Sequence, residues 1–313
     1  MSNNRNAVGG NPDGEDAVTA NPDGGPAVTA DPDGGDAAGG LAALLHRWRS
    51  DLAAWAIPEH ITAAVTDSPW VLPRAVFARR ADRLSAAPAG PSFERAFAAL
   101  EPSGSVLDVG SGAGAASLPL LPRCTTLTAV DSEPDMLDLL AQRAAGSGVP
   151  LRLIAGRWPD VAAEAGVADV VTCHHVTYNA PDIEPFLAAL TAAARRIVVV
   201  EMTAAHPLAM LNLLWLRFHG LVRPDGPTAD DLLAILAALG VSADARRWQR
   251  PGGRDYESFA ELVDVTRRRL CLPPDRAGEV AEALAGLGVE PDQPTELASS
   301  GRDVVTMWWP GQA

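Results

Sequence analysis

The residues best able to bind a ligand lie in a glycine-rich stretch with an acid at each end. Three glycines alternate with small residues after Asp108, and Asp131 closes the next apolar run. Glycine lets the chain turn sharply and lets a ligand approach bare backbone. A carboxylate at the end of a strand can accept two hydrogen bonds from ribose hydroxyls. The stretch therefore predicts a nucleoside-binding βαβ unit, with glycines at Gly110, Gly112 and Gly114.

Two neighbouring histidines, His174 and His175, are the best candidates for proton transfer, because imidazole titrates near neutral pH. Neighbours on an extended segment point to opposite faces, so only one of them can face a substrate without a twist. Glu201 and His206 follow the next strand and would share the same pocket. The alternative is that the histidines are hydrogen-bonded and hold a loop in place. No short ligand spacing supports a metal site, and we predict none.

These candidates must be positioned by a series of strands that alternate with helices, which is typical of a parallel sheet covered on both faces. In such sheets, ligands bind at the carboxyl ends of the strands. That edge would gather Asp131, residues 156–158, 173–175 and 201–203. Helices are expected to begin at Ala115, at Ser132 as the N-cap and at Thr228 as the N-cap. The predicted strands are 105–109, 126–130, 151–155, 169–173, 196–201, 241–249 and 304–308.

The glycine spacing and the first acid indicate which nucleoside is bound. A dinucleotide site has the form G-x-G-x-x-G, whereas this chain has G-x-G-x-G. The carboxylate of Asp108, two residues before the first glycine, would repel a pyrophosphate and favour a ligand that carries an ammonium group. A nicotinamide-dependent oxidoreductase is therefore a weaker alternative. A purely structural glycine turn is another, because a lone glycine pattern is a weak signal.

On these residues the sequence resembles the class I S-adenosylmethionine-dependent methyltransferases of actinobacterial, small-molecule type, whose first motif is D-x-G-x-G-x-G. The resemblance implies a Rossmann-like, seven-stranded, mostly parallel sheet with helices on both faces. It implies S-adenosyl-L-methionine as cofactor. The glycines would line its methionine and ribose portions, Asp108 would orient its amino-acid end and Asp131 would hold its ribose hydroxyls. The cofactor-binding residues expected are Asp108, Gly110, Gly112, Gly114, Asp131, Ser132, Gly156, Arg157, Trp158 and His174.

The catalytic residues expected are His175, Glu201 and His206. By analogy with the family, His174 lines the methionine end of the cofactor and His175 is left for proton transfer. Many relatives have Gly-Asp after the third strand, where this chain has Gly156 and Arg157, so the usual adenine contact is in doubt. Trp158 would supply a stacking face instead, or is a structural tryptophan.

The activity implied is methyl transfer to oxygen or nitrogen of a small molecule. A non-catalytic, cofactor-binding relative that acts through a partner is the alternative.

The composition excludes several other classes. All 25 basic residues are arginine, so Schiff-base and Walker A lysines are absent. A formal charge of −14 offers no basic surface for a nucleic acid, and we expect none as partner. Three widely spaced cysteines indicate neither a disulfide framework nor zinc. With no long apolar segment either, we expect a cytoplasmic protein without a membrane partner. The lack of lysine together with abundant Ala, Gly, Pro and Arg suggests a high-GC bacterial genome.

The chain divides into three parts by pattern. Residues 1–40 hold decapeptide repeats rich in Pro, Asp and Gly, and are predicted to be a disordered tail. Residues 41–100 are predicted to be an N-terminal helical cap, which covers the substrate side of the sheet or simply packs on the core. Residues 101–313 are predicted to form the methyltransferase domain. Within it, residues 204–227 include the apolar helix 208–218, a substrate lid or a homodimer face. Arginines 267–269 are expected on a solvated helix face, where they would attract a carboxylate-bearing substrate.

Overall fold

The computed structural model describes residues 37–63, 65–66, 68–69, 73–250, 256–294, 297 and 302–313. Residues 1–36, which hold most of the decapeptide repeats, therefore lie outside the described residues. Within the described residues, no helix has the length and apolar character needed to cross a membrane.

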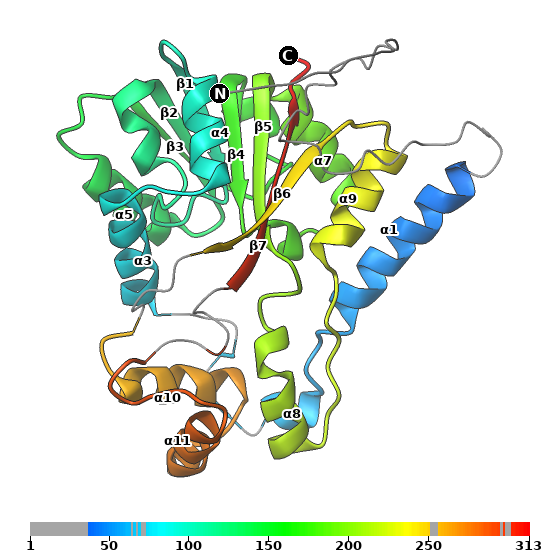
Figure 1. Ribbon diagram of the computed structural model, residues 1–313, viewed down its shortest axis with the longest axis vertical. Coiled ribbons are helices and arrows are strands. Elements are labelled where there is room, and N and C mark those ends of the chain that lie inside the picture. The colour runs from blue at the N-terminus through cyan, green and yellow to red at the C-terminus, as the bar shows by residue number, and fades with distance from the viewer. Residues whose placement is uncertain are drawn as a thin grey trace, which may run out of the picture.

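A seven-stranded sheet forms the centre of the molecule, with strand order β3-β2-β1-β4-β5-β7-β6 (Figure 1). The first five strands in this order are parallel, and β7 runs antiparallel to both β5 and β6. The prediction of a seven-stranded, mostly parallel sheet is thus confirmed. The strands are β1 (Gly104–Val109), β2 (Cys124–Asp131), β3 (Leu151–Ala155), β4 (Ala168–His174), β5 (Ala194–Thr203), β6 (Asp244–Arg250) and β7 (Arg302–Pro310).

Helices cover both faces of the sheet, and alternate residues of each central strand face different helices. Val106 packs with α4 (Pro91–Ala99) and α5 (Pro134–Ala144). Its neighbour Leu107 belongs to the opposite core, formed with α1 (Ala37–Ala53), α7 (Ile183–Ala192) and α9 (Ala229–Ala238). Two buried layers therefore hold the sheet from both sides and fix its carboxyl edge in place.

A third core joins helices from three distant parts of the chain. We call this group of helices the helical cap, which is distinct from the N-terminal cap predicted at 41–100. Its members are α2 (Glu59–Thr62), Val76 of α3 (Arg74–Ala86), α8 (Asn212–His219), α10 (Phe259–Arg269) and α11 (Ala277–Gly286). Figure 1 shows α8, α10 and α11 gathered beyond the carboxyl ends of the parallel strands. The predicted helical cap at 41–100 is thus divided, because α1 and α4 pack on opposite faces of the sheet while α2 and Val76 join the third core.

The helix expected to begin at Ala115 is wrong. Residues 112–117 form turns, and a 3₁₀ helix, η1 (Leu118–Arg123), follows them. Pro119 and Pro122 lie within η1. Proline has no backbone N–H to donate and its ring crowds the preceding turn, so an α-helix is disfavoured here. The chain instead returns to the sheet after a short, tight connection.

Two predictions about helix ends have different outcomes. The capping box at Thr228 is confirmed: its side chain accepts from the Asp231 N–H, and the Asp231 carboxylate accepts from the Thr228 N–H. The prediction that Ser132 is the N-cap of the helix after β2 is wrong. That helix, α5, begins at Pro134, and Glu133 occupies the capping position without a side-chain hydrogen bond. The Asp131 carboxylate accepts the Glu133 N–H instead, at 2.9 Å.

The predicted solvated arginine run is also wrong in part. Arg267 is 5% exposed and donates to the Leu272 carbonyl at 2.6 Å and to Asp264 at 2.7 Å. Its burial follows from its place on the side of α10 that packs in the helical cap, where the guanidinium holds the end of that helix.

Candidate active site

The glycine turn connects β1 to the turns that precede η1, and all three of its glycines have positive φ. At Gly110, a side-chain Cβ would lie 2.3 Å from Val176, and at Gly114 it would lie 2.7 Å from Leu118. At Gly112, no atom lies within 4 Å of the Cβ position, so the turn is open there. The outer glycines are needed for packing, whereas Gly112 faces free space where a ligand can reach the backbone.

Asp131 is hydrogen-bonded to this turn. Its Oδ2 accepts from the Gly112 N–H at 2.8 Å, and its Oδ1 accepts from the Glu133 N–H at 2.9 Å. The side chain is only partly buried, and Ser132 beside it is exposed. Each carboxylate oxygen can accept more than one hydrogen bond, so Asp131 keeps acceptor capacity toward the solvent side of the turn.

Asp108 lies beneath the turn and is 1% exposed. Its Oδ1 accepts from the Thr172 hydroxyl at 2.9 Å, but its Oδ2 has no hydrogen-bond partner. Burial raises the pKa of this carboxyl. The buried Oγ of Ser111 and Nε2 of His174 also have no partner. Ser117 Oγ is a fourth such atom in this segment. Leaving such a group unpaired costs about 1–3 kcal/mol each, so this group of atoms around one turn favours a polar ligand there.

The segment after β3 contributes less than the sequence predicts. The Gly156 N–H donates to the Asp131 carbonyl at 2.9 Å, which holds this segment against the end of β2. Arg157 is exposed. Trp158 packs against the core, and its indole N–H donates to the Phe186 carbonyl at 3.2 Å. These contacts favour the structural alternative for Trp158 over a stacking face for the ligand.

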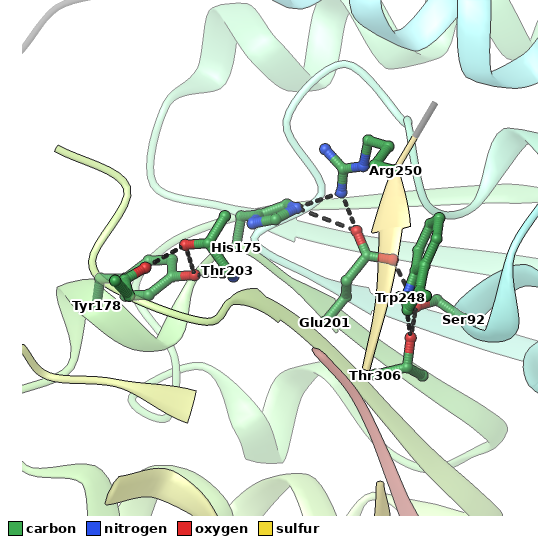
Figure 2. Close-up of polar contacts among 9 residues, drawn as sticks. Ser92, His175, Tyr178, Glu201, Thr203, Trp248, Arg250 and Thr306 are labelled. Carbon is green, nitrogen blue, oxygen red and sulfur yellow. Dashed lines mark hydrogen bonds and ion pairs between the residues drawn. The ribbon is translucent and has the colours of Figure 1, made fainter. Parts of the chain in front are cut away.

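His175 and Glu201 meet at the carboxyl edge of β4 and β5, as the sequence predicts. His175 Nε2 lies 3.0 Å from Glu201 Oε1, and the His175 N–H donates to the Glu201 carbonyl at 2.7 Å. His175 has φ of +59°, so the backbone makes the twist that lets it turn away from the strand direction. Figure 2 shows the two side chains pointing toward one another.

A third member of this cluster, Arg250, was not among the residues expected from the sequence. It ends β6, and its Nη2 lies 2.5 Å from His175 Nε2 and also contacts Glu201 Oε1 (Figure 2). Strand β6 runs parallel to β5, because β7 is antiparallel to both, so its end lies at the same edge of the sheet. The predicted strand ends at Gln249, one residue short of Arg250. With the observed strand end, the rule that ligands bind at the carboxyl ends of strands points to Arg250.

The cluster changes the charge states of its members. Burial raises the pKa of Glu201, but Arg250 and the hydrogen bond to His175 outweigh burial and hold it well below its usual range. Burial and Arg250 together lower the pKa of His175 to about 4, against the opposing effect of Glu201. At neutral pH the cluster therefore contains a carboxylate, a guanidinium and a neutral imidazole.

The second oxygen of Glu201 is held from the other side. Ser92, in α4, donates to Glu201 Oε2 at 2.5 Å and lies 2.6 Å from the hydroxyl of Thr306 in β7. The indole N–H of Trp248, in β6, donates to the same Thr306 hydroxyl at 2.9 Å. Figure 2 shows this chain of contacts on the far side of Glu201 from His175. No pattern in the sequence indicated Ser92.

His206 lies in a different environment from His175 and Glu201. Its ring stacks on Trp55 at 4.0 Å and meets the edge of Tyr178 at 5.4 Å. It is 8% exposed, and burial together with Arg223 lowers its pKa to about 3. Its contacts, with Trp55 just after α1 and with Tyr178 after β4, are those of a structural histidine. Among the described residues, no group of three or more histidine, cysteine or acidic side chains could hold a metal ion.

Residues 106–196 match the family model of a methyltransferase domain, a segment that holds the glycine turn, Asp131 and His175. This segment of the chain is therefore similar to the methyltransferase domain family. No curated protein matches the sequence.

Solved structures with a similar fold include the YcgJ protein of Bacillus subtilis, with 18% identity over 71% of this chain and 98% of that chain and a TM-score of 0.47. The O-methyltransferase TomG from Streptomyces achromogenes, solved with S-adenosylmethionine, has 16% identity over 86% of this chain and 99% of that one, with a TM-score of 0.40. Magnesium protoporphyrin IX methyltransferase from Synechocystis has 20% identity over 69% and 91%, with a TM-score of 0.43. At these identities and TM-scores we infer nothing about the acceptor.

Proposed function

We propose that this protein methylates an oxygen or nitrogen of a small-molecule acceptor, with His175 receiving the acceptor's proton and Glu201 holding the His175 ring. The observation that carries the proposal is the contact between His175 Nε2 and Glu201 Oε1, at 3.0 Å, at the edge where the glycine turn also ends. A base is needed only where the acceptor atom carries a proton, as a hydroxyl does.

The residues around the glycine turn fit the cofactor. The unpartnered Oδ2 of Asp108 is suited to an ammonium group, and Ser111 Oγ and His174 Nε2 are suited to a neighbouring carboxylate. Asp131 has acceptor capacity left for ribose hydroxyls, and Gly112 leaves room for the ligand beside the backbone. When bound, the cofactor supplies a methyl group already activated by its sulfonium.

The task left to the protein is to align the acceptor and to exclude water. The helical cap lies beyond the same edge of the sheet as His175, which supports a role for it in covering the acceptor. His175 is neutral at pH 7, so one ring nitrogen is free to receive a proton. Glu201, fixed by Ser92, holds the ring in place and would stabilise the imidazolium that forms.

Labelled methyl transfer tests this function. The purified protein is incubated with methyl-labelled S-adenosylmethionine and a panel of small phenols, alcohols and amines, and products are detected by mass spectrometry. We expect at least one product class, reduced about 100-fold or more in His175→Gln. Trp158→Phe serves as a control outside the reacting cluster. Equal turnover by His175→Gln and the parent would overturn the role given to His175.

A further inference from the structure

Arg250 occupies a place that methyl transfer alone does not explain. It is the last residue of β6, outside the segment that matches the methyltransferase domain, and its side chain is 12% exposed. A single guanidinium nitrogen, Nη2, contacts both Glu201 Oε1 and His175 Nε2. A cation thus contacts both the candidate base and the carboxylate that orients it.

The charges that face His175 come from three strands. Glu201 faces it from β5, Arg250 from β6, and His174 is its neighbour at the end of β4. Glu201 has a side chain only 7% exposed, and a buried carboxylate of this kind needs a counter-charge and a full set of hydrogen bonds. Arg250 supplies the counter-charge, while Ser92 completes the bonds on the other oxygen.

We propose that Arg250 is a positioning residue, which holds Glu201 as a carboxylate and keeps the His175 imidazole unprotonated and in place. Its consequence for catalysis rests on the proposed function, because His175 must be the base for the effect to appear in turnover. The effect on His175 itself does not depend on any acceptor.

The electrostatics support this role. Glu201 and Arg250 act on His175 with opposite signs: the carboxylate favours the imidazolium, and the guanidinium and burial oppose it. The balance leaves the pKa of His175 at about 4. A histidine that paired with Glu201 alone would gain a proton more easily, and at pH 6 much of it would be unable to act as a base. Arg250 therefore widens the pH range over which His175 can accept a proton.

Nuclear magnetic resonance tests this directly on the full-length protein without an acceptor. Histidines are labelled with ¹³C at Cε1, and the His175 signal among the six histidines is assigned by its loss in His175→Gln. In the parent, His175 should not titrate between pH 8 and pH 5. In Arg250→Gln, its midpoint should rise by about one pH unit or more, whereas Glu201→Gln should leave it unprotonated to still lower pH.

Two further variants make the result specific. Arg250→Lys keeps the positive charge and should restore part of the low midpoint. Arg247→Gln removes an exposed arginine of the same strand, which pairs with Asp230, and should leave the His175 signal unchanged. Where methyl transfer to the panel is measured, kcat/KM is followed against pH. In Arg250→Gln, the acidic limb of this profile should shift to higher pH together with the His175 midpoint.

The proposal is overturned if His175 titrates near its ordinary value in the parent, an outcome that needs no variant to fold. It is also overturned if folded Arg250→Gln leaves an initially low midpoint unchanged. Absence of methyl transfer to every acceptor would count against the proposed function and would leave the titration result standing.

Discussion

The backbone N–H of Gly112 donates a hydrogen bond to Oδ2 of Asp131 at 2.8 Å, across a sequence separation of 19 residues. The central glycine of the turn and the acid at the end of β2 are therefore one structural unit. The contact sets the direction of the carboxylate, and the open space above Gly112 lies beside it.

Replacing Asp131 should separate folding from cofactor binding. In Asp131→Ala, the acceptors proposed for the ribose hydroxyls are lost, and hydrogen bonds to a charged group contribute about 1.5–3 kcal/mol. We expect affinity for S-adenosylhomocysteine to fall by about tenfold or more, measured by titration calorimetry. Asp138→Ala, which removes an exposed acid from α5, is the matched control. Unchanged affinity in Asp131→Ala would refute the assignment of Asp131.

The glycines of the turn should respond differently to an added methyl group. Gly112→Ala and Gly146→Ala both place alanine at positive φ with no atom within 4 Å of the new Cβ. Each should lose about 1–2 kcal/mol in the free energy of unfolding, followed with urea. Only Gly112→Ala should also lose affinity for the cofactor. Gly110→Ala should be the least stable of the three, since its Cβ would lie 2.3 Å from Val176. Equal binding by the Gly112 and Gly146 variants would argue against a ligand at Gly112.

Replacing Asp108 should raise the stability of the protein and lower its affinity for the cofactor. A raised carboxyl pKa means that ionised Asp108 is disfavoured in the folded protein, so this destabilisation is present at neutral pH and disappears as the pH falls below the unfolded value. Asp108→Asn removes the buried charge. Without cofactor, the melting temperature at pH 7.5 should rise, by the equivalent of about 1 kcal/mol. Affinity for S-adenosylmethionine should fall, because the partner for its ammonium is gone. A loss of both stability and affinity would contradict this account.

His206 should make the fold sensitive to acid. Its folded pKa of about 3 lies below the ordinary value of 6.5, so the unfolded chain binds a proton that the folded chain excludes. His206 therefore carries no penalty above pH 6.5, and the free energy of unfolding decreases as the pH falls from there toward 3. In His206→Gln, the free energy of unfolding should decrease less steeply with falling pH than in the parent. The difference in slope should be up to about 1.4 kcal/mol per pH unit. Urea denaturation at pH 7.5, 6 and 5 measures it, and parallel curves for the two proteins would be the contrary result.

The sheet and the cofactor edge could be predicted from the sequence because they depend on local signals. Apolar runs of strand type marked six of the seven strands, whereas β6 is mostly polar, and the glycines and acids of the turn marked the cofactor edge. The pairing of His175 with Glu201 followed from one rule, that parallel strands end at a common edge.

What escaped prediction depends on contacts between distant segments. The helical cap combines residues from near Ile61, Leu214 and Val280, and no local pattern shows that such helices share a core. Ser92 lies 109 residues from Glu201 in sequence, and a serine at a helix start usually indicates only a cap. The helix expected at Ala115 is wrong for the opposite reason: a local signal, the prolines at 119 and 122, outweighs the apolar character of the run.

The short 3₁₀ connection after the glycine turn has an electrostatic consequence. A long α-helix directed at a turn brings a macrodipole, with partial positive charge that attracts phosphates. The turns at 112–117 and the η1 segment, with its two prolines, provide no such aligned field behind Gly110, Gly112 and Gly114. What remains at the turn is the negative potential of Asp108 and Asp131. The same two prolines that disfavour an α-helix here therefore help this turn to discriminate against nucleotides that carry a diphosphate and in favour of a nucleoside with a cationic tail.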